Sequence, residues 1–112
     1  DDFAICTRLN VYDGLPYPWG WGVRRDDSSE MPQPDMVEPA RLVAELTALG
    51  VDCVSVTAGN PYFRPQINRP ADRTIAAAPP PSEHPLKGVA RLIELTGVIQ
   101  RSQPQLAVIL VE

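Results

Sequence analysis

The stretch Leu106-Ala-Val-Ile-Leu-Val111 is apolar at every position and rich in β-branched residues. A strand with one solvated face alternates apolar and polar residues, whereas a strand covered on both faces of a parallel sheet is apolar throughout. Two other short apolar runs, Phe3–Arg8 and Val51–Val56, also predict strands. The chain is therefore expected to be an α/β protein built on a parallel sheet.

Two amphipathic patterns lie between these runs and predict helices. The first covers about residues 38–49, with Pro39 suited to its first turn and Gly50 to its C-terminal end. The second covers about residues 85–101, and Ser82 is its expected N-cap. The predicted buried faces are Leu42, Val43, Leu46 and Leu49 in the first helix, and Leu86, Val89, Ala90, Ile93 and Gly97 in the second.

The connecting segments in this β-α-β-α-β order differ in length. Each helix returns to the next strand quickly, whereas each strand reaches its helix only after about 25 to 30 residues. Long loops after parallel strands are where α/β proteins build their binding and catalytic sites. Because the order begins and ends on a strand, we expect residues 1–112 to form one incomplete unit of a larger α/β fold, with open sheet edges.

Composition excludes several classes of function. The formal net charge of −4 argues against a nucleic-acid-binding protein, and no apolar run is long enough to predict a membrane span. His84 is the one histidine, and no metal-ligand spacing or phosphate-binding glycine loop is present. Cys6 and Cys53 fall in apolar runs and are interpreted as buried thiols of a cytoplasmic protein, although a disulfide stays possible.

Three groups of residues are candidates for chemistry. Arg8 ends the first predicted strand and could hold an anion or a polarised carbonyl, or else form an ion pair with Asp13 or Asp52. The loop after the second strand, which contains Tyr62, is either a ligand-facing loop or a self-packed surface loop. Residues 13–22 predict a turn and an aromatic lid, whose tryptophans pack on a neighbouring loop or stack on a ligand.

Four segments together resemble one known family. They are Arg8-Leu-Asn-Val-Tyr-Asp13, Gly50-Val-Asp-Cys-Val-Ser-Val-Thr-Ala-Gly-Asn-Pro-Tyr62, Asn68-Arg-Pro70 and His84-Pro-Leu86. In this order they resemble the NADH:flavin oxidoreductase, or old yellow enzyme, family, and its dienoyl-CoA-reductase-like branch in particular. Members of that family are FMN-dependent TIM barrels. The resemblance implies that residues 1–112 are part of such a barrel, about strands five to seven with two crossover helices.

The resemblance also implies roles for individual residues. Arg8 matches the arginine beside the N1–C2=O edge of the flavin, where a fixed cation stabilises the negative charge of the reduced ring. Asn10 stands where many relatives have serine and would help to line the pocket floor, and Tyr62 would face the substrate. Gln66 and Ala71 depart from the family pattern. The family's substrate-orienting histidine pair, its proton-donating tyrosine and most of its phosphate site belong to other parts of the barrel.

Two hypotheses of function follow. In the first, the chain is part of a cytoplasmic, FMN-dependent oxidoreductase that uses NAD(P)H to reduce an activated C=C bond, or a related carbonyl group, of a small molecule. The segment alone is then expected to be inactive. In the second, it is a non-catalytic half-barrel that docks or self-associates. Under both hypotheses we expect a homo-oligomer or association with the missing barrel segments, because open sheet edges favour pairing.

Overall fold

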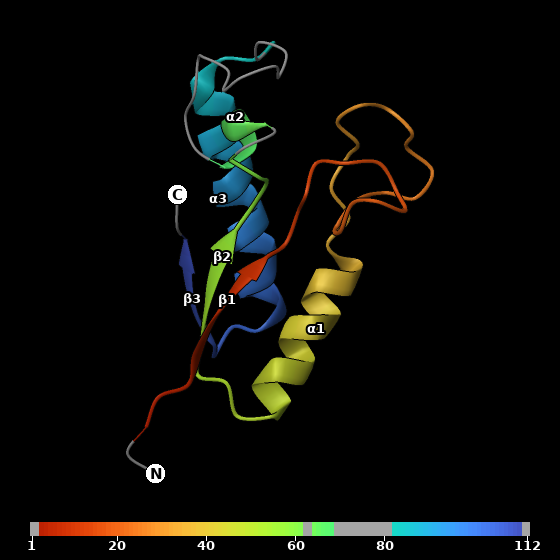
Figure 1. Cartoon of the computed structure of the whole chain (residues 1–112). Helices are drawn as coiled ribbons and strands as arrows, with labels where there is room; N and C mark the ends of the chain where they lie inside the picture. Colours follow the sequence, from red (N-terminus) through yellow and green to blue (C-terminus); the bar gives the residue numbers. More distant parts are fainter. Residues whose placement is uncertain (1–2, 62–63, 69–81, 111–112) are drawn as a thin grey trace.

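The computed structural model describes residues 3–61, 64–68 and 82–110 (Figure 1). Three strands, β1 (Cys6–Asn10), β2 (Cys53–Thr57) and β3 (Ala107–Leu110), form one sheet in the order β1-β2-β3. Helix α1 (Val37–Ala48) follows β1, and the short α2 (Pro65–Asn68) and the long α3 (Pro85–Ser102) follow β2. The predicted β-α-β-α-β order is confirmed, and α2, which is too short to leave a periodic pattern, is an addition to it.

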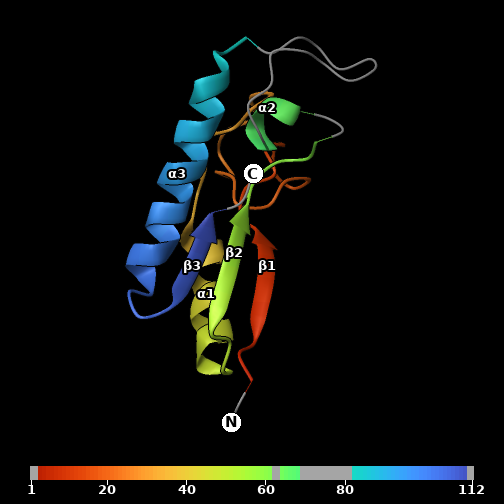
Figure 2. The ribbon, with the colours of Figure 1, turned by 90° about the vertical axis from the view of Figure 1, so that its left-hand side faces the viewer.

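Both strand pairs are parallel, as predicted. Figure 2 views the sheet with its strands pointing upward, β2 to the left of β1, and α1 and α3 behind. Both crossovers are therefore right-handed, as parallel βαβ units almost always are. The bounds of the first two strands differ from the predicted ones. β1 begins at Cys6 and continues two residues beyond Arg8, and β2 begins at Cys53 and ends at Thr57 instead of covering Val51–Val56.

Helix α1 ends as the sequence predicts, but its last leucine is exposed. The Gly50 N–H donates to the Thr47 carbonyl at 3.1 Å and the Val51 N–H donates to the Leu46 carbonyl at 3.0 Å, while Gly50 has φ +102°. This is the Schellman ending that glycine favours. Leu49 was predicted to be buried and is 82% exposed, because it belongs to this ending and not to the helix.

The predicted buried face of α3 is wrong. Leu86 and Ile93 are 65% and 56% exposed, and the buried residues are instead Gly88, Leu92, Leu95 and Ile99. Both sets follow helical spacing, so periodicity alone could not choose between them. The choice is made by packing against the sheet and α2, since a Cβ at Gly88 would lie only 2.1 Å from the Gln66 carbonyl oxygen.

The N-cap of α3 is His84 and not the predicted Ser82. Its Nδ1 accepts a hydrogen bond from the Leu86 N–H at 3.2 Å, and Pro85 occupies the first turn. An imidazole nitrogen can do this because the first N–H groups of any helix lack partners within the helix. His84 is therefore a capping residue.

The two faces of the sheet have different surroundings. Because side chains alternate along a strand, Leu9, Val54, Val56, Val108 and Leu110 share one face, and α1 and α3 pack on it. Val43, Leu92, Leu95 and Ile99 belong to the same core. The other face, which we call the open face, is covered by neither helix (Figure 2).

The two cysteines lie on the open face and differ in exposure. They are directly opposite each other in the β1–β2 register, and both are free thiols. Cys53, in the central strand, is buried as predicted. Cys6, in a strand with a neighbour on one side only among the described residues, is exposed, so its predicted burial is wrong.

Candidate functional site

The residues of the open face form rows across the three strands. In the middle row Arg8 lies opposite Ser55, which lies opposite Ile109. In the row above, at the carboxyl ends of the strands, Asn10 lies opposite Thr57. This places a guanidinium, an amide and two hydroxyl groups on one surface, next to the ends of the strands where α/β proteins bind their ligands.

Arg8 is exposed and makes no hydrogen bond or ion pair through its side chain among the described residues. The alternative of an ion pair with Asp13 or Asp52 is not found. Asp52 accepts the Ile5 N–H at 2.8 Å, and Asp13 accepts the Trp21 N–H at 2.8 Å. Arg8 was predicted at the end of its strand and lies in the middle of β1, so its long side chain starts below the strand ends.

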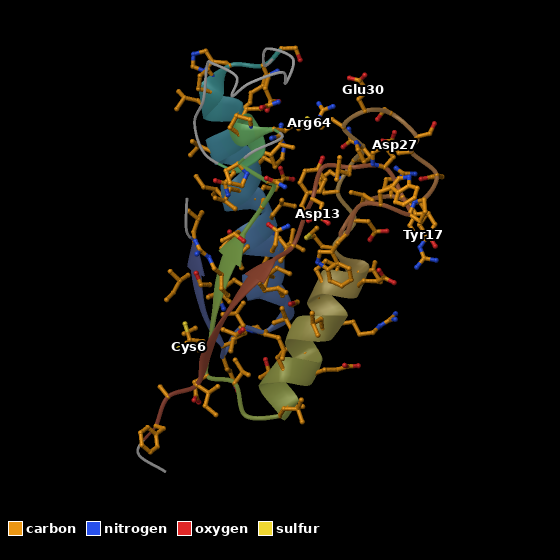
Figure 3. All side chains as sticks on the ribbon, in the orientation of Figure 1. Cys6, Asp13, Tyr17, Asp27, Glu30 and Arg64 are labelled. Atoms are coloured by element: carbon orange, nitrogen blue, oxygen red, sulfur yellow. The ribbon has the colours of Figure 1, made fainter. Side chains whose placement is uncertain are left out.

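Asn10 joins the sheet to the loop that follows it. Its Nδ2 donates to Asp13 Oδ1 at 2.5 Å, and its Oδ1 accepts from Thr57 Oγ1 at 3.3 Å. Figure 3 shows Asp13 where the chain leaves β1. Asn10 and Arg8 are thus on one face of the sheet, but the amide of Asn10 is already engaged. Its role is to hold the carboxyl ends of β1 and β2 together.

Ser55 and Thr57 were not singled out by the sequence reasoning. Their signal was the alternation in Cys53-Val-Ser-Val-Thr57, in which polar residues occupy every second position of a strand. A strand covered on both faces does not need that alternation. The pattern therefore already indicated a polar face beside Arg8.

Most of the described hydrogen-bond donors in the loop after β2 are buried or bonded to other parts of the chain. Arg64 forms an ion pair with Glu30 at 3.6 Å, Asn68 Nδ2 donates to the Ala58 carbonyl at 3.2 Å, and Gln66 is buried. This supports a self-packed loop for residues 64–68. Tyr62, Ala71 and the proline-rich residues 76–81 lie outside the described residues.

The aromatic residues near the site differ in how exposed they are. Trp19 is 82% exposed, so it does not pack on a neighbouring loop, and Trp21 is half-buried. Tyr12 is on the covered side, where its hydroxyl donates to the Pro32 carbonyl at 2.6 Å. Burial raises the pKa of the Tyr12 hydroxyl, and the nearby Arg91 and Arg64 oppose that rise. Tyr12 is therefore a structural residue and does not reach the open face.

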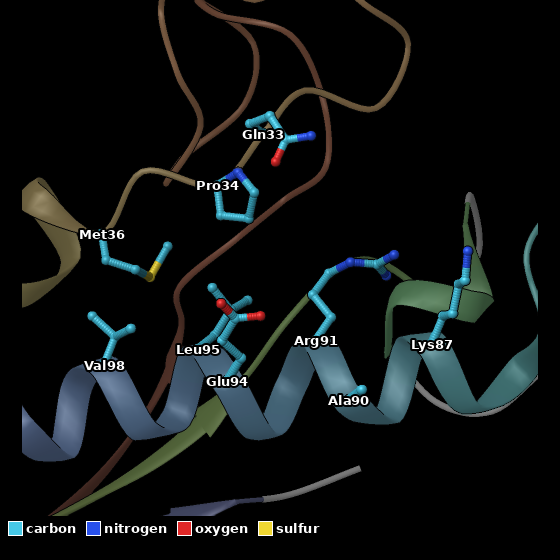
Figure 4. Close-up of a pocket in the computed structure, with 9 residues that line it drawn as sticks. All are labelled: Gln33, Pro34, Met36, Lys87, Ala90, Arg91, Glu94, Leu95 and Val98. Carbon is cyan, nitrogen blue, oxygen red and sulfur yellow. The ribbon is translucent and has the colours of Figure 1, made fainter.

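A separate cavity lies on the helix side of the molecule. It has a volume of about 570 Å³ and lies between residues 33–36 and α3 (Figure 4). Its walls combine Met36, Leu95 and Val98 with Lys87, Arg91 and Glu94. Because Leu95 packs on the covered face of the sheet, the sheet separates this cavity from Arg8. The cavity and the open face cannot hold the same small ligand.

The described residues offer little other chemistry. They contain no group of three or more His, Cys, Asp or Glu side chains that could bind a metal ion. The helices among them include none that is long and apolar enough to cross a membrane. Comparisons with protein-family models, curated proteins and solved structures find no match. The open face with its unpaired Arg8 is consequently the best candidate site, and its groups suit a planar ligand that carries negative charge or carbonyl oxygens.

Proposed function

We propose that this chain is part of an FMN-dependent NAD(P)H oxidoreductase of the old yellow enzyme type, which acts on an activated C=C bond or a related carbonyl compound. Two features support the proposal beside the sequence resemblance. The parallel β-α-β-α-β order with right-handed crossovers is the repeating unit of a TIM barrel. In such a barrel the open face would line the interior, and the carboxyl ends of its strands would border the ligand site.

Arg8 is the observation that carries the proposal. Its guanidinium is on the open face and has no partner among the described residues, and the carboxylates of Asp13 and Asp52 accept backbone N–H groups instead. A cation that the fold leaves unpaired beside hydroxyl groups fits the N1–C2=O edge of a flavin, which accepts hydrogen bonds and gains negative charge on reduction.

The described residues fit one edge of FMN. Arg8 would hold the N1–C2=O edge, Ser55 and Thr57 would line the same surface, and Asn10 would keep the strand ends together through Thr57 and Asp13. FMN, when bound, supplies hydride-transfer chemistry. The loop that contains Tyr62 would border the substrate. The resemblance places most of the phosphate site in other parts of the barrel.

This half-site leads us to expect weak binding of FMN by the chain alone. Without a phosphate anchor we expect a Kd of about 1 mM, so micromolar FMN should keep its fluorescence nearly unchanged in the presence of the chain. At millimolar FMN, amide resonances of Arg8, Asn10 and Ser55 should shift in a saturable way in ¹H–¹⁵N spectra. Resonances of Lys87 and Val98, beside the helix-side cavity, should not shift.

The matched variants are Arg8→Ala and Arg41→Ala. Arg41 is also an exposed arginine but belongs to α1, on the other side of the molecule. We expect Arg8→Ala to abolish the saturable shifts and Arg41→Ala to leave them unchanged. Shifts that map to the helix-side cavity, or that survive in Arg8→Ala, would contradict the proposal. Binding below about 1 μM would instead show that the chain holds a complete site.

A second candidate is a non-catalytic docking or self-associating half-barrel. The observation in its favour is the open face itself, where Ile109 is 50% exposed beside polar residues. One measurement separates the two candidates, made on the chain mixed with the other segments of the proposed barrel or on the protein purified from cells. Flavin absorbance that co-purifies with the assembled protein supports the enzyme, whereas a colourless assembly supports the docking module.

A further inference from the structure

Cys6 and Cys53 are the first residues of two neighbouring strands and lie directly opposite each other. The residues just before them fix this register. The Asp52 N–H donates to the Ile5 carbonyl at 2.8 Å, and the Ile5 N–H donates to Asp52 Oδ2 at 2.8 Å. Because the two residues share a row, their side chains leave the sheet on the same side, the open face.

The spacing of a sheet brings such a pair within disulfide range. Neighbouring strands lie about 4.8 Å apart, and the Cα atoms of disulfide-bonded cysteines are usually about 4.4–6.8 Å apart. The Cβ atoms of opposite residues in parallel strands stay about as far apart as the Cα atoms, whereas a relaxed disulfide has Cβ atoms about 3.8 Å apart. A bond between these residues would therefore pull the strand ends together and be easily reduced.

The two thiols differ in access. Cys6 is exposed, and its sulfur points away from α1 in Figure 3, whereas Cys53 is 9% exposed. Burial raises the pKa of the Cys53 thiol, and the neighbouring Cys6 thiol raises it further. Cys6 is thus the thiol that a reagent meets first, and Cys53 is the neighbour that can resolve an adduct on it.

We propose that Cys6 and Cys53 are a dithiol modification site that a small disulfide, such as oxidised glutathione, converts reversibly into an intramolecular disulfide. The Cys6 thiolate attacks one sulfur of oxidised glutathione, which forms a mixed disulfide and releases one glutathione thiolate. The Cys53 thiolate then attacks the Cys6 sulfur and releases the second glutathione. Two cysteine thiols are oxidised, one glutathione disulfide is reduced to two glutathione thiols, and the two protons that the cysteines lose pass to the two glutathione thiolates.

The product would cross-link β1 to β2 at the end of the sheet opposite to the strand carboxyl ends. Arg8 and Ser55 form the next row on the same face, so the bond constrains the spacing of the strands directly below the candidate site. The inference does not depend on the proposed flavin chemistry, because it concerns only the two thiols and the strand register.

The test uses the intact chain, folded and fully reduced, with oxidised glutathione at a series of ratios to reduced glutathione. The wild type should lose the mass of two hydrogens, form no disulfide between chains on a non-reducing denaturing gel, and yield a peptide in which Cys6 is joined to Cys53 of the same chain. Cys53→Ser should stop at one glutathione adduct on Cys6. Cys6→Ser should react with oxidised glutathione at least about tenfold more slowly than Cys53→Ser, because its one remaining thiol, that of Cys53, is buried.

Three outcomes would overturn the proposal. A wild type that stops at the glutathione adduct shows that Cys53 does not reach the Cys6 sulfur in the folded chain. A disulfide that forms faster in 6–8 M urea, roughly the range that unfolds small domains, shows that the fold hinders the reaction. Equal rates for Cys6→Ser and Cys53→Ser show that access does not decide which thiol is attacked.

Discussion

At the scale of single residues, Asp27 organises the long loop between β1 and α1. One carboxylate oxygen accepts the Ser29 hydroxyl at 2.6 Å and the Ser29 N–H at 3.1 Å, and the other accepts the Gln33 N–H at 2.8 Å. These bonds stabilise the charged carboxylate, the Ser29 hydroxyl most of all, and lower the pKa of Asp27. The loop leads directly to Pro32, whose carbonyl accepts the hydroxyl of buried Tyr12.

The lowered pKa predicts how this loop responds to acid. Because the folded pKa lies below the unfolded one, the carboxylate contributes stability that is fully present above the unfolded pKa, about 3.9, and is lost as pH falls through the folded pKa. We expect a carbon-detected titration of the Asp27 carboxyl to have its midpoint below that ordinary value. Ser29→Ala should raise the midpoint, whereas Ser28→Ala, which removes an exposed neighbouring hydroxyl, should not. An unshifted midpoint in the wild type would contradict the bonding described for Asp27.

At the scale of elements, α3 contains two glycines whose surroundings differ. A Cβ at Gly88 would lie 2.1 Å from the Gln66 carbonyl oxygen, a backbone atom of α2. A Cβ at Gly97 would approach only the guanidinium of Arg101, at 3.0 Å, and that side chain can move. Gly88 therefore allows α2 and α3 to pack closely, and Gly97 has no such role.

Alanine substitution at these two positions should change stability in opposite directions. Gly97→Ala should raise the free energy of unfolding by about 0.5–1 kcal/mol, because alanine favours a helix interior over glycine. Gly88→Ala should lower it by about 1–3 kcal/mol, because α2 must move away from α3. Urea denaturation of both variants measures the difference. Equal effects of the two substitutions would show that α2 does not pack on α3 as described.

The same helix explains what could be predicted from the sequence. The apolar runs and the loop asymmetry predicted the order of elements along the chain and the parallel pairing, because both are local signals. The buried face of α3 was predicted wrongly, since Leu86 and Ile93 are as apolar and as regularly spaced as Leu92 and Ile99. Only the position of α2 and the sheet distinguishes the two faces, and that is tertiary information. Cys6 was misassigned for a similar reason, because exposure depends on which strand lies at an edge.

In the candidate site, too, some features could be predicted from the sequence and others could not. The family resemblance assigns both Arg8 and Asn10 to the cofactor site, and alternation along β1 places them on the open face. Ser55 and Thr57 could have been added from the alternation in β2. The hydrogen bond from Asn10 to Asp13 could not have been predicted, because it depends on how the chain turns after the strand. Local patterns thus predict which face a residue occupies and not which partner it finds there.

At the scale of the whole molecule, the sheet exposes more than a stable monomer usually does. Among the described residues β1 and β3 each pair on one side only, and neither helix covers the open face. Unpaired strand edges present rows of backbone donors and acceptors that favour pairing with another chain. Ile109 adds an exposed apolar side chain to the open face of β3. We therefore expect the chain to be a dimer or larger assembly in solution.

Light scattering at about 10–100 μM protein, a range in which contacts of micromolar Kd are populated, measures this association. Ile109→Lys should shift the assembly toward the monomer, because it places a charge on the open face beside Arg8. Ile93→Lys is the matched control, since Ile93 is 56% exposed, close to the 50% of Ile109, but belongs to α3. An equal loss of association in both variants would place the contact on the helix layer instead. A cooperatively unfolding monomer of 12.3 kDa at every concentration would contradict the prediction, because the open face would then be stable in water without a partner.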